Sequence, residues 1–325
     1  MVRSLWVLIA AAGKPELLQR TLSSLAAATK PASYRGALVV ENGPRCGIEQ
    51  IVRGFAPEHR FAHLYVREAN KSHALNCGLQ LLEFGLVFMT DDDVRLDENV
   101  LVAYDDAARG IDRGEFYGGP VLIDAEHGLP PQWMRKFYAF TIAESWSLPH
   151  SVRTAVPSQN FMGTNWAAFA EDLVAAGGFD SRFGPGGTTG ATGQESEAQR
   201  ALHKIHCQSI YVPQATAWHH LHKEFLDPRW VLKRAYRHGL EWGIRRTRDK
   251  RSTAPLMLHA TLRRLNAHAK GLGLRILGGE EREFTAAYHE AKWRGRLDGM
   301  RMGQKWQEFP RMEVAKSMAN HSRAA

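Results

Sequence analysis

The stretch Leu86-Val87-Phe88-Met89-Thr90-Asp91-Asp92-Asp93 joins a short, mostly apolar run to three consecutive aspartates. An apolar run of this length is typical of a strand that is buried on both faces of a parallel sheet. Ligands of open α/β sheets bind at the carboxyl ends of such strands, and like charges gathered there are unfavourable unless a cation neutralises them. Because Mg²⁺ and Mn²⁺ take oxygen ligands and often share them with substrate phosphates, the stretch predicts a metal–diphosphate site. Taken alone, the triplet also fits a polar loop in which Asp97 caps a helix that starts near Val100.

Strands and helices alternate around this stretch. Apolar runs predict strands, and apolar residues at helical spacing predict helices between them. The expected strands cover residues 5–11, 37–40, 61–66 and 116–123, and the expected helices cover residues 15–25 and 74–82. After a Gly-, Pro- and aromatic-rich middle, a helix near Glu195 and a strand pair at 209–212 and 216–221 follow. The order implies right-handed βαβ units, so the predicted class is α/β with a mostly parallel sheet flanked by helices.

The composition suits a globular protein with an anionic partner. The 325 residues are 44% hydrophobic and carry a net charge of +8. Nucleotide-sugar phosphates, an anionic membrane surface and nucleic acid all fit that sign. Three scattered cysteines provide no disulfide framework and suit a reducing cytoplasm. No signal segment opens the chain and no apolar run approaches the roughly 20 residues of a membrane span, so we expect a soluble or peripherally attached protein.

Four features in this order resemble a family 2 glycosyltransferase with the GT-A fold. They are the opening strand with Ala10-Ala11-Ala12-Gly13-Lys14, the strand end Val39-Val40-Glu41-Asn42-Gly43, the aspartate triplet as a D-x-D motif, and Gly163-Thr164-Asn165 followed by Gly177-Gly178-Phe179-Asp180 and Gly193-Gln194-Glu195. The resemblance covers roughly residues 4–245. It implies a Rossmann-like catalytic domain over residues 1–225, divided into a nucleotide-binding half, 1–123, and an acceptor half, 124–225. A basic helical extension would occupy residues 226–325.

The resemblance also assigns residues to the donor and its metal. Asp93 is expected to ligate Mn²⁺ or Mg²⁺ directly, with Asp91 beside it and His219 completing the metal shell. If the segment around His219 is a strand, His220 and His222 share the opposite face. Glu41 stands where the family usually has aspartate, which leaves the base of the donor open. The residues expected to contact the nucleotide are Ala10, Ala12, Lys14, Glu41, Asn42, Lys71, Asp91 and Asp92.

Glu195 is the expected general base. A carboxylate must take the proton of the acceptor hydroxyl in an inverting transfer, and glutamate is ionised at neutral pH. The stretch Thr192-Gly193-Gln194-Glu195 also fits a capping box that starts a helix. Glu197 is expected to pair with Arg200. The wall of the acceptor site is expected to include Asn165, Trp166, Phe179 and Asp180.

The region after Pro228 is helical and basic, with aromatic residues between the cations. Two interpretations stay open. The helix suits a membrane interface, where aromatic and basic side chains gather, or it packs on the catalytic domain with a solvated basic side. The segment from about 253 to 300 has helical periodicity, and we expect the chain past about 310 to be poorly ordered.

These observations predict a cytoplasmic, metal-dependent, inverting glycosyltransferase, with peripheral contact at the inner face of the plasma membrane as an open question. It would move a hexose-type sugar from a nucleotide-sugar, with a UDP-sugar as the first choice, to a hydroxyl of a glycan or other acceptor in polysaccharide or glycoconjugate synthesis. Two alternatives remain: a non-catalytic nucleotide-sugar-binding module and a metal-dependent nucleotidyltransferase. A nucleic-acid partner is the weakest interpretation, because no recognition motif accompanies the basic residues.

Overall fold

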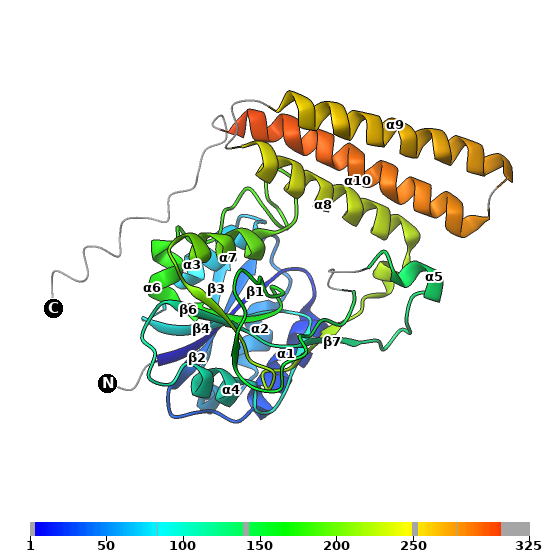
Figure 1. Ribbon diagram of the computed structural model, residues 1–325. Coiled ribbons are helices and arrows are strands. Elements are labelled where there is room, and N and C mark those ends of the chain that lie inside the picture. The colour runs from blue at the N-terminus through cyan, green and yellow to red at the C-terminus, as the bar shows by residue number, and fades with distance from the viewer. Residues whose placement is uncertain (1–3, 83, 139–142, 249–252, 278, 307–325) are drawn as a thin grey trace.

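The computed structural model describes residues 4–82, 84–138, 143–248, 253–277 and 279–306. Figure 1 shows an α/β body, coloured mainly blue to green, and three long helices, coloured yellow to orange-red, that lie beyond one edge of it. The tail past about residue 310, for which the sequence predicts poor order, lies outside the described residues.

The body is built on an eight-stranded sheet in the order β3-β2-β1-β4-β9-β6-β10-β8. Its strands are β1 (Ser4–Ala11), β2 (Tyr34–Asn42), β3 (Phe61–Val66), β4 (Gly85–Asp91), β6 (Glu115–Gly118), β8 (Thr154–Ala155), β9 (Asn165–Phe169) and β10 (Gln208–Tyr211). The four strands from β3 to β4 are parallel, as predicted, so their carboxyl ends meet at one edge. β9 runs antiparallel to both of its neighbours, β4 and β6.

Hydrophobic cores cover both faces of the sheet, because successive side chains of a strand point to opposite faces. In β1, Val7 and Ile9 enter one core, whereas Leu8 and Ala10 enter the other. The first core is closed by α1 (Pro15–Ala27), α2 (Ile48–Arg53) and α4 (Val100–Ala107), and the second by α3 (Lys71–Leu79), α6 (Ala170–Ala175) and α7 (Gln194–Lys204). The remaining short turns of helix in the body are η1 (Pro57–His59), α5 (Gln132–Arg135) and η2 (Lys223–Leu226).

A second sheet of three strands, β5-β11-β7, corrects two predictions. It consists of β5 (Val94–Leu96), β7 (Val121–Asp124) and β11 (Ala217–His220). The single strand predicted over 116–123 is divided at Gly119-Pro120 into β6 and β7, which join different sheets, because Pro120 has no N–H and Gly119 lies against the backbone of Ala215. The predicted strand pair does not pair either, since β10 lies in the large sheet and β11 in the small one.

The C-terminal helices are α8 (Pro228–Thr247), α9 (Ala254–Leu277) and α10 (Glu280–Gln304). α8 and α10 approach so closely that a Cβ atom on any of five glycines would collide with the facing helix. These glycines are Gly239 and Gly243 on α8 and Gly295, Gly299 and Gly303 on α10. Packing at this distance gives the two helices an extensive contact without large side chains between their backbones.

The glycine contact predicts a sharp difference between two helical glycines. Gly299→Ala would place a methyl group against the Leu240 carbonyl oxygen, so the free energy of unfolding should fall by about 1–3 kcal/mol. Gly271→Ala in α9 is the matched control, because its new methyl group would lie 3.7 Å from Ala286 and helix propensity favours alanine by up to about 1 kcal/mol. Urea unfolding followed by circular dichroism measures both. Equal effects of the two substitutions would contradict the close packing of α8 on α10.

Candidate active site

A cleft of about 760 Å³ opens where β1, β2 and β4 end. One wall consists of strand ends and the residues that follow them. The rest of the lining includes residues 159–164, the start of α7 and one side of α8. Seven of the eight residues predicted to contact the nucleotide line this cleft: Ala10, Ala12, Lys14, Asn42, Lys71, Asp91 and Asp92.

Glu41 is the predicted nucleotide contact that the structure places outside the cleft lining. Its side chain is buried, and both carboxylate oxygens already have partners. Oε1 accepts a hydrogen bond from the backbone N–H of Cys46 at 2.8 Å, and Oε2 lies 2.9 Å from His63 Nε2. Glu41 therefore holds the segment after β2 against β3, and the expected contact with the donor base has no support in this geometry.

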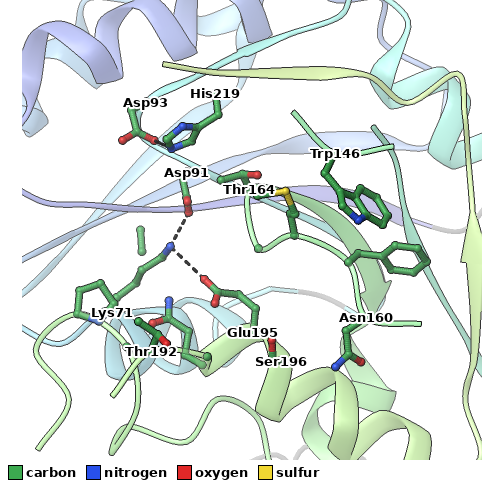
Figure 2. A pocket seen from close by; sticks show the side chains of 18 of the residues that line it. Lys71, Asp91, Asp93, Trp146, Asn160, Thr164, Thr192, Glu195, Ser196 and His219 are labelled. Atoms are coloured by element: carbon green, nitrogen blue, oxygen red, sulfur yellow. Dashed lines mark hydrogen bonds and ion pairs between the residues drawn. The ribbon is translucent and has the colours of Figure 1, made fainter. Parts of the chain in front are cut away.

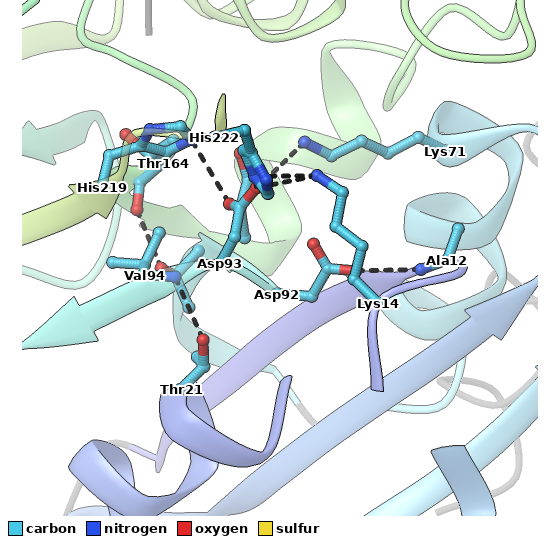
Figure 3. Close-up of polar contacts among 12 residues, drawn as sticks. Ala12, Lys14, Thr21, Lys71, Asp92, Asp93, Val94, Thr164, His219 and His222 are labelled. Atoms are coloured by element: carbon cyan, nitrogen blue, oxygen red, sulfur yellow. Dashed lines mark hydrogen bonds and ion pairs between the residues drawn. The ribbon is translucent and has the colours of Figure 1, made fainter. Parts of the chain in front are cut away.

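The aspartate triplet lies at the end of β4, and its three carboxylates have different surroundings. Asp91 is the last residue of β4 and half-buried, whereas Asp93 is buried. Asp92 accepts a hydrogen bond from the backbone N–H of Ala12 at 2.9 Å (Figure 3). Burial, followed by the charge of Asp93, raises the pKa of Asp92 to about 7 although the Ala12 N–H opposes that shift. The Asp92 carboxyl therefore gives up its proton less readily than an ordinary aspartate.

Asp91, Asp93 and His219 form a group suited to a divalent cation. One ligand atom from each lies within 4.8 Å of the other two. Within the described part of the chain, the buried Oδ1 of Asp93 accepts no hydrogen bond, although His219 Nε2 is 3.3 Å away. An unused lone pair on a buried carboxylate, beside a second carboxylate and an imidazole, fits a metal site. These are the three residues that the sequence predicted as ligands.

His222 is a further contact of Asp93 that the sequence analysis placed on the wrong side. The alternation of a strand would turn His222 away from His219, but β11 ends at His220 and the chain turns there. His222 Nε2 lies 2.7 Å from Asp93 Oδ2, and Lys14 Nζ lies 3.1 Å from the same oxygen (Figure 3). Burial would raise the pKa of Asp93, but His219, His222 and Lys14 together hold it well below its ordinary value. Asp93 is therefore an anion.

Lys71 connects the triplet to Glu195 across the cleft. Its Nζ lies 2.5 Å from Asp91 Oδ1 and 3.4 Å from Glu195 Oε1 (Figure 2). Burial would lower the pKa of Lys71, but Asp91 and then Glu195 outweigh it and raise that pKa. The lysine is positively charged, and it comes from the start of α3, where Asn70 accepts a hydrogen bond from the His73 N–H as N-cap.

Glu195 lies in the first turn of α7 and points into the cleft (Figure 2). The N-cap is Gly193, and no side chain caps the helix, so the capping-box interpretation of Glu195 is wrong. The carboxylate packs over Gly163, where a Cβ atom would collide with it. Glu197, two residues on, is turned away and pairs with Arg200 at 2.7 Å, as predicted.

The four residues predicted to form the acceptor wall do not line the cleft. Trp166 and Phe179 are buried in the hydrophobic core, where their rings meet edge to face. Phe179 is held there by Asn76, which both donates to and accepts from its backbone at 2.8 Å. Asn165 is buried and donates to the carbonyl oxygens of Pro120 and Ala215, and Asp180 pairs with Arg182. These residues shape the protein behind the cleft.

The cleft wall contains residues that the sequence analysis missed. Trp146, Gln159 and Asn160 come from the Gly- and Pro-rich middle, where no periodicity marked them. One side of α8 contributes Arg234, Arg237, His238 and Glu241. The spacing of these four, at i, i+3, i+4 and i+7, is a polar stripe that was visible in the sequence.

The comparisons with known proteins agree with this geometry. The model of the family described as "Glycosyltransferase like family 2" matches residues 3–238, so the chain belongs to that family. No curated protein sequence matches it. Among solved structures, it is similar to the mannosyltransferase PcManGT from Pyrobaculum calidifontis in complex with GDP-Man and Mn²⁺, with a TM-score of 0.56 and 16% identity over 95% of this chain and 89% of that one. GalNAc-T7 with UDP, GalNAc and Mn²⁺ is also similar, with a TM-score of 0.51 and 14% identity over 74% and 48%. The fold is GT-A.

The metal group predicts graded losses of Mn²⁺ affinity. Asp93→Ala removes a predicted ligand and should weaken Mn²⁺ binding by more than about 100-fold. His222→Ala removes only a partner of that ligand and should weaken Mn²⁺ binding by about 10-fold. The exposed Asp106→Ala should leave the affinity unchanged. Electron paramagnetic resonance of free Mn²⁺ measures all three. Wild-type affinity in Asp93→Ala would exclude this metal site.

Proposed function

We propose that this protein is a metal-dependent, inverting glycosyltransferase that moves a sugar from a nucleotide-sugar to an acceptor hydroxyl. The observation that carries the proposal is the placement of one carboxylate, Glu195, across a single cleft from the group Asp91, Asp93 and His219. A metal–diphosphate site and a base that face each other are what an in-line transfer needs.

In this proposal Asp91, Asp93 and His219 hold a divalent cation, which, when bound, neutralises the charge of the donor diphosphate. Lys14 and Lys71 add positive charge on the same side of the cleft. Glu195 takes the proton of the acceptor hydroxyl, and the acceptor oxygen attacks the anomeric carbon of the sugar. The bond from that carbon to the diphosphate oxygen breaks, and the nucleoside diphosphate leaves with the bonding electron pair.

Inversion is proposed because the described cleft offers Glu195 as a base but no second carboxylate placed as a nucleophile. Asp91 and Asp93 belong to the metal group, Asp92 accepts a hydrogen bond from Ala12, and Glu241 is engaged by Arg200 at 2.9 Å. A single displacement, with the base on the acceptor side and the leaving group on the metal side, inverts the anomeric centre. A retaining path through a glycosyl-enzyme would need a further carboxylate near the sugar.

The metal and the donor base are finer proposals. The imidazole of His219 supports Mn²⁺ over Mg²⁺, because Mg²⁺ prefers oxygen ligands and water. A UDP-sugar remains the first donor to test, but the engagement of Glu41 removes the argument from that residue. GDP-mannose is the necessary comparison, since the similar mannosyltransferase was solved with GDP-Man and the similar GalNAc-T7 with UDP.

The test is a panel of UDP- and GDP-sugars with Mn²⁺, with released nucleoside diphosphate as the readout. We expect release from one donor that requires metal, that is lost in Asp93→Ala, and that falls by about 10²–10⁴ in Glu195→Gln with donor affinity retained. Anomeric configuration of the product by NMR reports inversion. Donor binding without turnover, even with pooled hydroxyl acceptors, would favour a binding module, and release of pyrophosphate would indicate a nucleotidyltransferase.

We also propose peripheral contact with an anionic membrane at the inner face of the plasma membrane, through α9. The aromatic side chains of α8 do not support the contact, because Trp230 packs on Phe225 and Trp242 packs between the C-terminal helices. The exposed apolar side chains lie on α9 at i, i+4 and i+7: Leu258, Leu262 and Leu265. α9 contains Arg263, Arg264, Lys270 and Arg275 but neither Asp nor Glu. Such a helix suits the surface of anionic lipids.

Two further observations bear on location. In the described residues, no helix is long and apolar enough to cross a bilayer. The three cysteines are free thiols, which supports the proposed cytoplasmic location because thiols are kept reduced there.

Vesicle flotation tests the membrane contact. The protein should float with vesicles that contain phosphatidylglycerol and not with pure phosphatidylcholine, and Leu258→Gln with Leu262→Gln should reduce the partition coefficient by about tenfold or more. Leu81→Gln with Leu129→Gln is the control, because these leucines are equally exposed on the α/β body. Equal partition of the two double variants would reject α9 as the contact.

A further inference from the structure

The polar stripe of α8 brings two arginines to the cleft without a paired acid. Arg234 Nε donates to His238 Nε2 at 3.2 Å, and Arg237 Nε donates to the carbonyl oxygen of Gly190 at 2.9 Å. Across the described residues, neither guanidinium lies within 4.0 Å of a carboxylate oxygen, the limit for an ion pair. Glu241, the acid of the stripe, lies 2.9 Å from Arg200 instead.

The two guanidinium groups are only partly exposed, so their charges are poorly compensated. Burial, followed by the charge of Arg237, lowers the pKa of Arg234 to about 10, and Glu195 is among the acids near enough to oppose that shift. Burial also lowers the pKa of Arg237. Both side chains still carry a full charge at neutral pH. Two adjacent cations that face a cavity and form no ion pair with a carboxylate are typical of a site for a multiply charged anion.

Other cations of the cleft are available to bind the donor diphosphate. Lys14 is bound to Asp93, and Lys71 lies between Asp91 and Glu195, on the side of the cleft where the metal group stands. Arg234 and Arg237 come from α8, and Glu195 is near both groups of cations, because it lies 3.4 Å from Lys71 and close enough to Arg234 to oppose the shift of that pKa. An anion on the arginines would therefore belong to the molecule whose hydroxyl meets Glu195.

We propose that Arg234 and Arg237 form an acceptor subsite for a phosphate group, so that the acceptor is a phosphate-bearing alcohol rather than a neutral sugar. The proposal rests on the proposed function and names its acceptor class. Planar guanidinium groups bind phosphate oxygens in pairs, and two of them match the double charge of a phosphate monoester. His238 Nδ1 lies 3.2 Å from Thr192 Oγ1, and this contact orients the imidazole. His238 Nε2 accepts the hydrogen bond from Arg234, so His238 positions that arginine.

Calorimetry with glycerol 3-phosphate as the probe tests the subsite. The full chain is first saturated with Mn²⁺ and nucleoside diphosphate, and glycerol is the neutral comparison. We expect glycerol 3-phosphate to bind and glycerol not to bind. Arg234→Gln with Arg237→Gln should weaken that binding by about tenfold or more and leave nucleoside diphosphate affinity unchanged. Arg245→Gln with Arg246→Gln removes the same charge from exposed positions of the same helix and should change neither affinity.

Three results would overturn the subsite: no binding of glycerol 3-phosphate to the saturated wild type, equal affinity in the two double variants, or a matching loss of nucleoside diphosphate affinity. The last result would assign the arginines to the donor. Thermal unfolding of each variant identifies a loss that comes from misfolding. Two titrations separate the two proposals. Failure of the wild type to bind nucleoside diphosphate would reject the proposed function. Titration of glycerol 3-phosphate in the absence of nucleotide tests phosphate binding by Arg234 and Arg237 independently.

Discussion

The charge at the end of β4 is the constraint on which the rest of the site depends. Three adjacent carboxylates are stable in a partly buried position only if cations from elsewhere meet them. The chain supplies two cations, Lys14 after β1 and Lys71 at the start of α3, and two imidazole partners, His219 near the end of β11 and His222 just after it. The parallel register of β1 on β4 and the pairing of β11 with β5 bring these groups together. The large sheet and the small sheet therefore meet beside the aspartate triplet.

The cleft contains two groups of charged side chains, and Glu195 is near both of them. On the side of the sheet, carboxylates outnumber the cations that reach them and leave room for a metal ion. On the side of α8, the hydrogen bonds of Arg234 and Arg237 go to His238 and to the Gly190 carbonyl oxygen rather than to a carboxylate. Lys71 contacts both Asp91 and Glu195, so one side chain joins the metal group to the proposed base. In the proposed transfer, the donor diphosphate would bind at the metal group and the acceptor phosphate at the arginines of α8.

The sequence predicted what local pattern determines, and missed what depends on tertiary contacts. The strands before Ala12, Asn42 and Asp91 were readable because buried parallel strands are short apolar runs. The contact of His222 with Asp93 was not readable from the sequence, because the direction of this side chain depends on where β11 ends. Trp166 and Phe179 were assigned to the wall of the cleft because an aromatic residue in a glycine-rich region suits either a wall or a core. For Phe179, paired hydrogen bonds with Asn76 hold the residue in the core, and those join residues that lie about a hundred positions apart.

The glycine contact between α8 and α10 has a mechanical consequence. The family match ends at residue 238, part of the way along α8, yet the backbone of that helix is locked against α10 by glycines beyond that point. Close-packed helices transmit strain from one to the other. Helix α8 carries the arginines of the cleft wall, and helix α10 carries the surface that contacts α9. A displacement of α10 would therefore also displace α8, which lines the cleft.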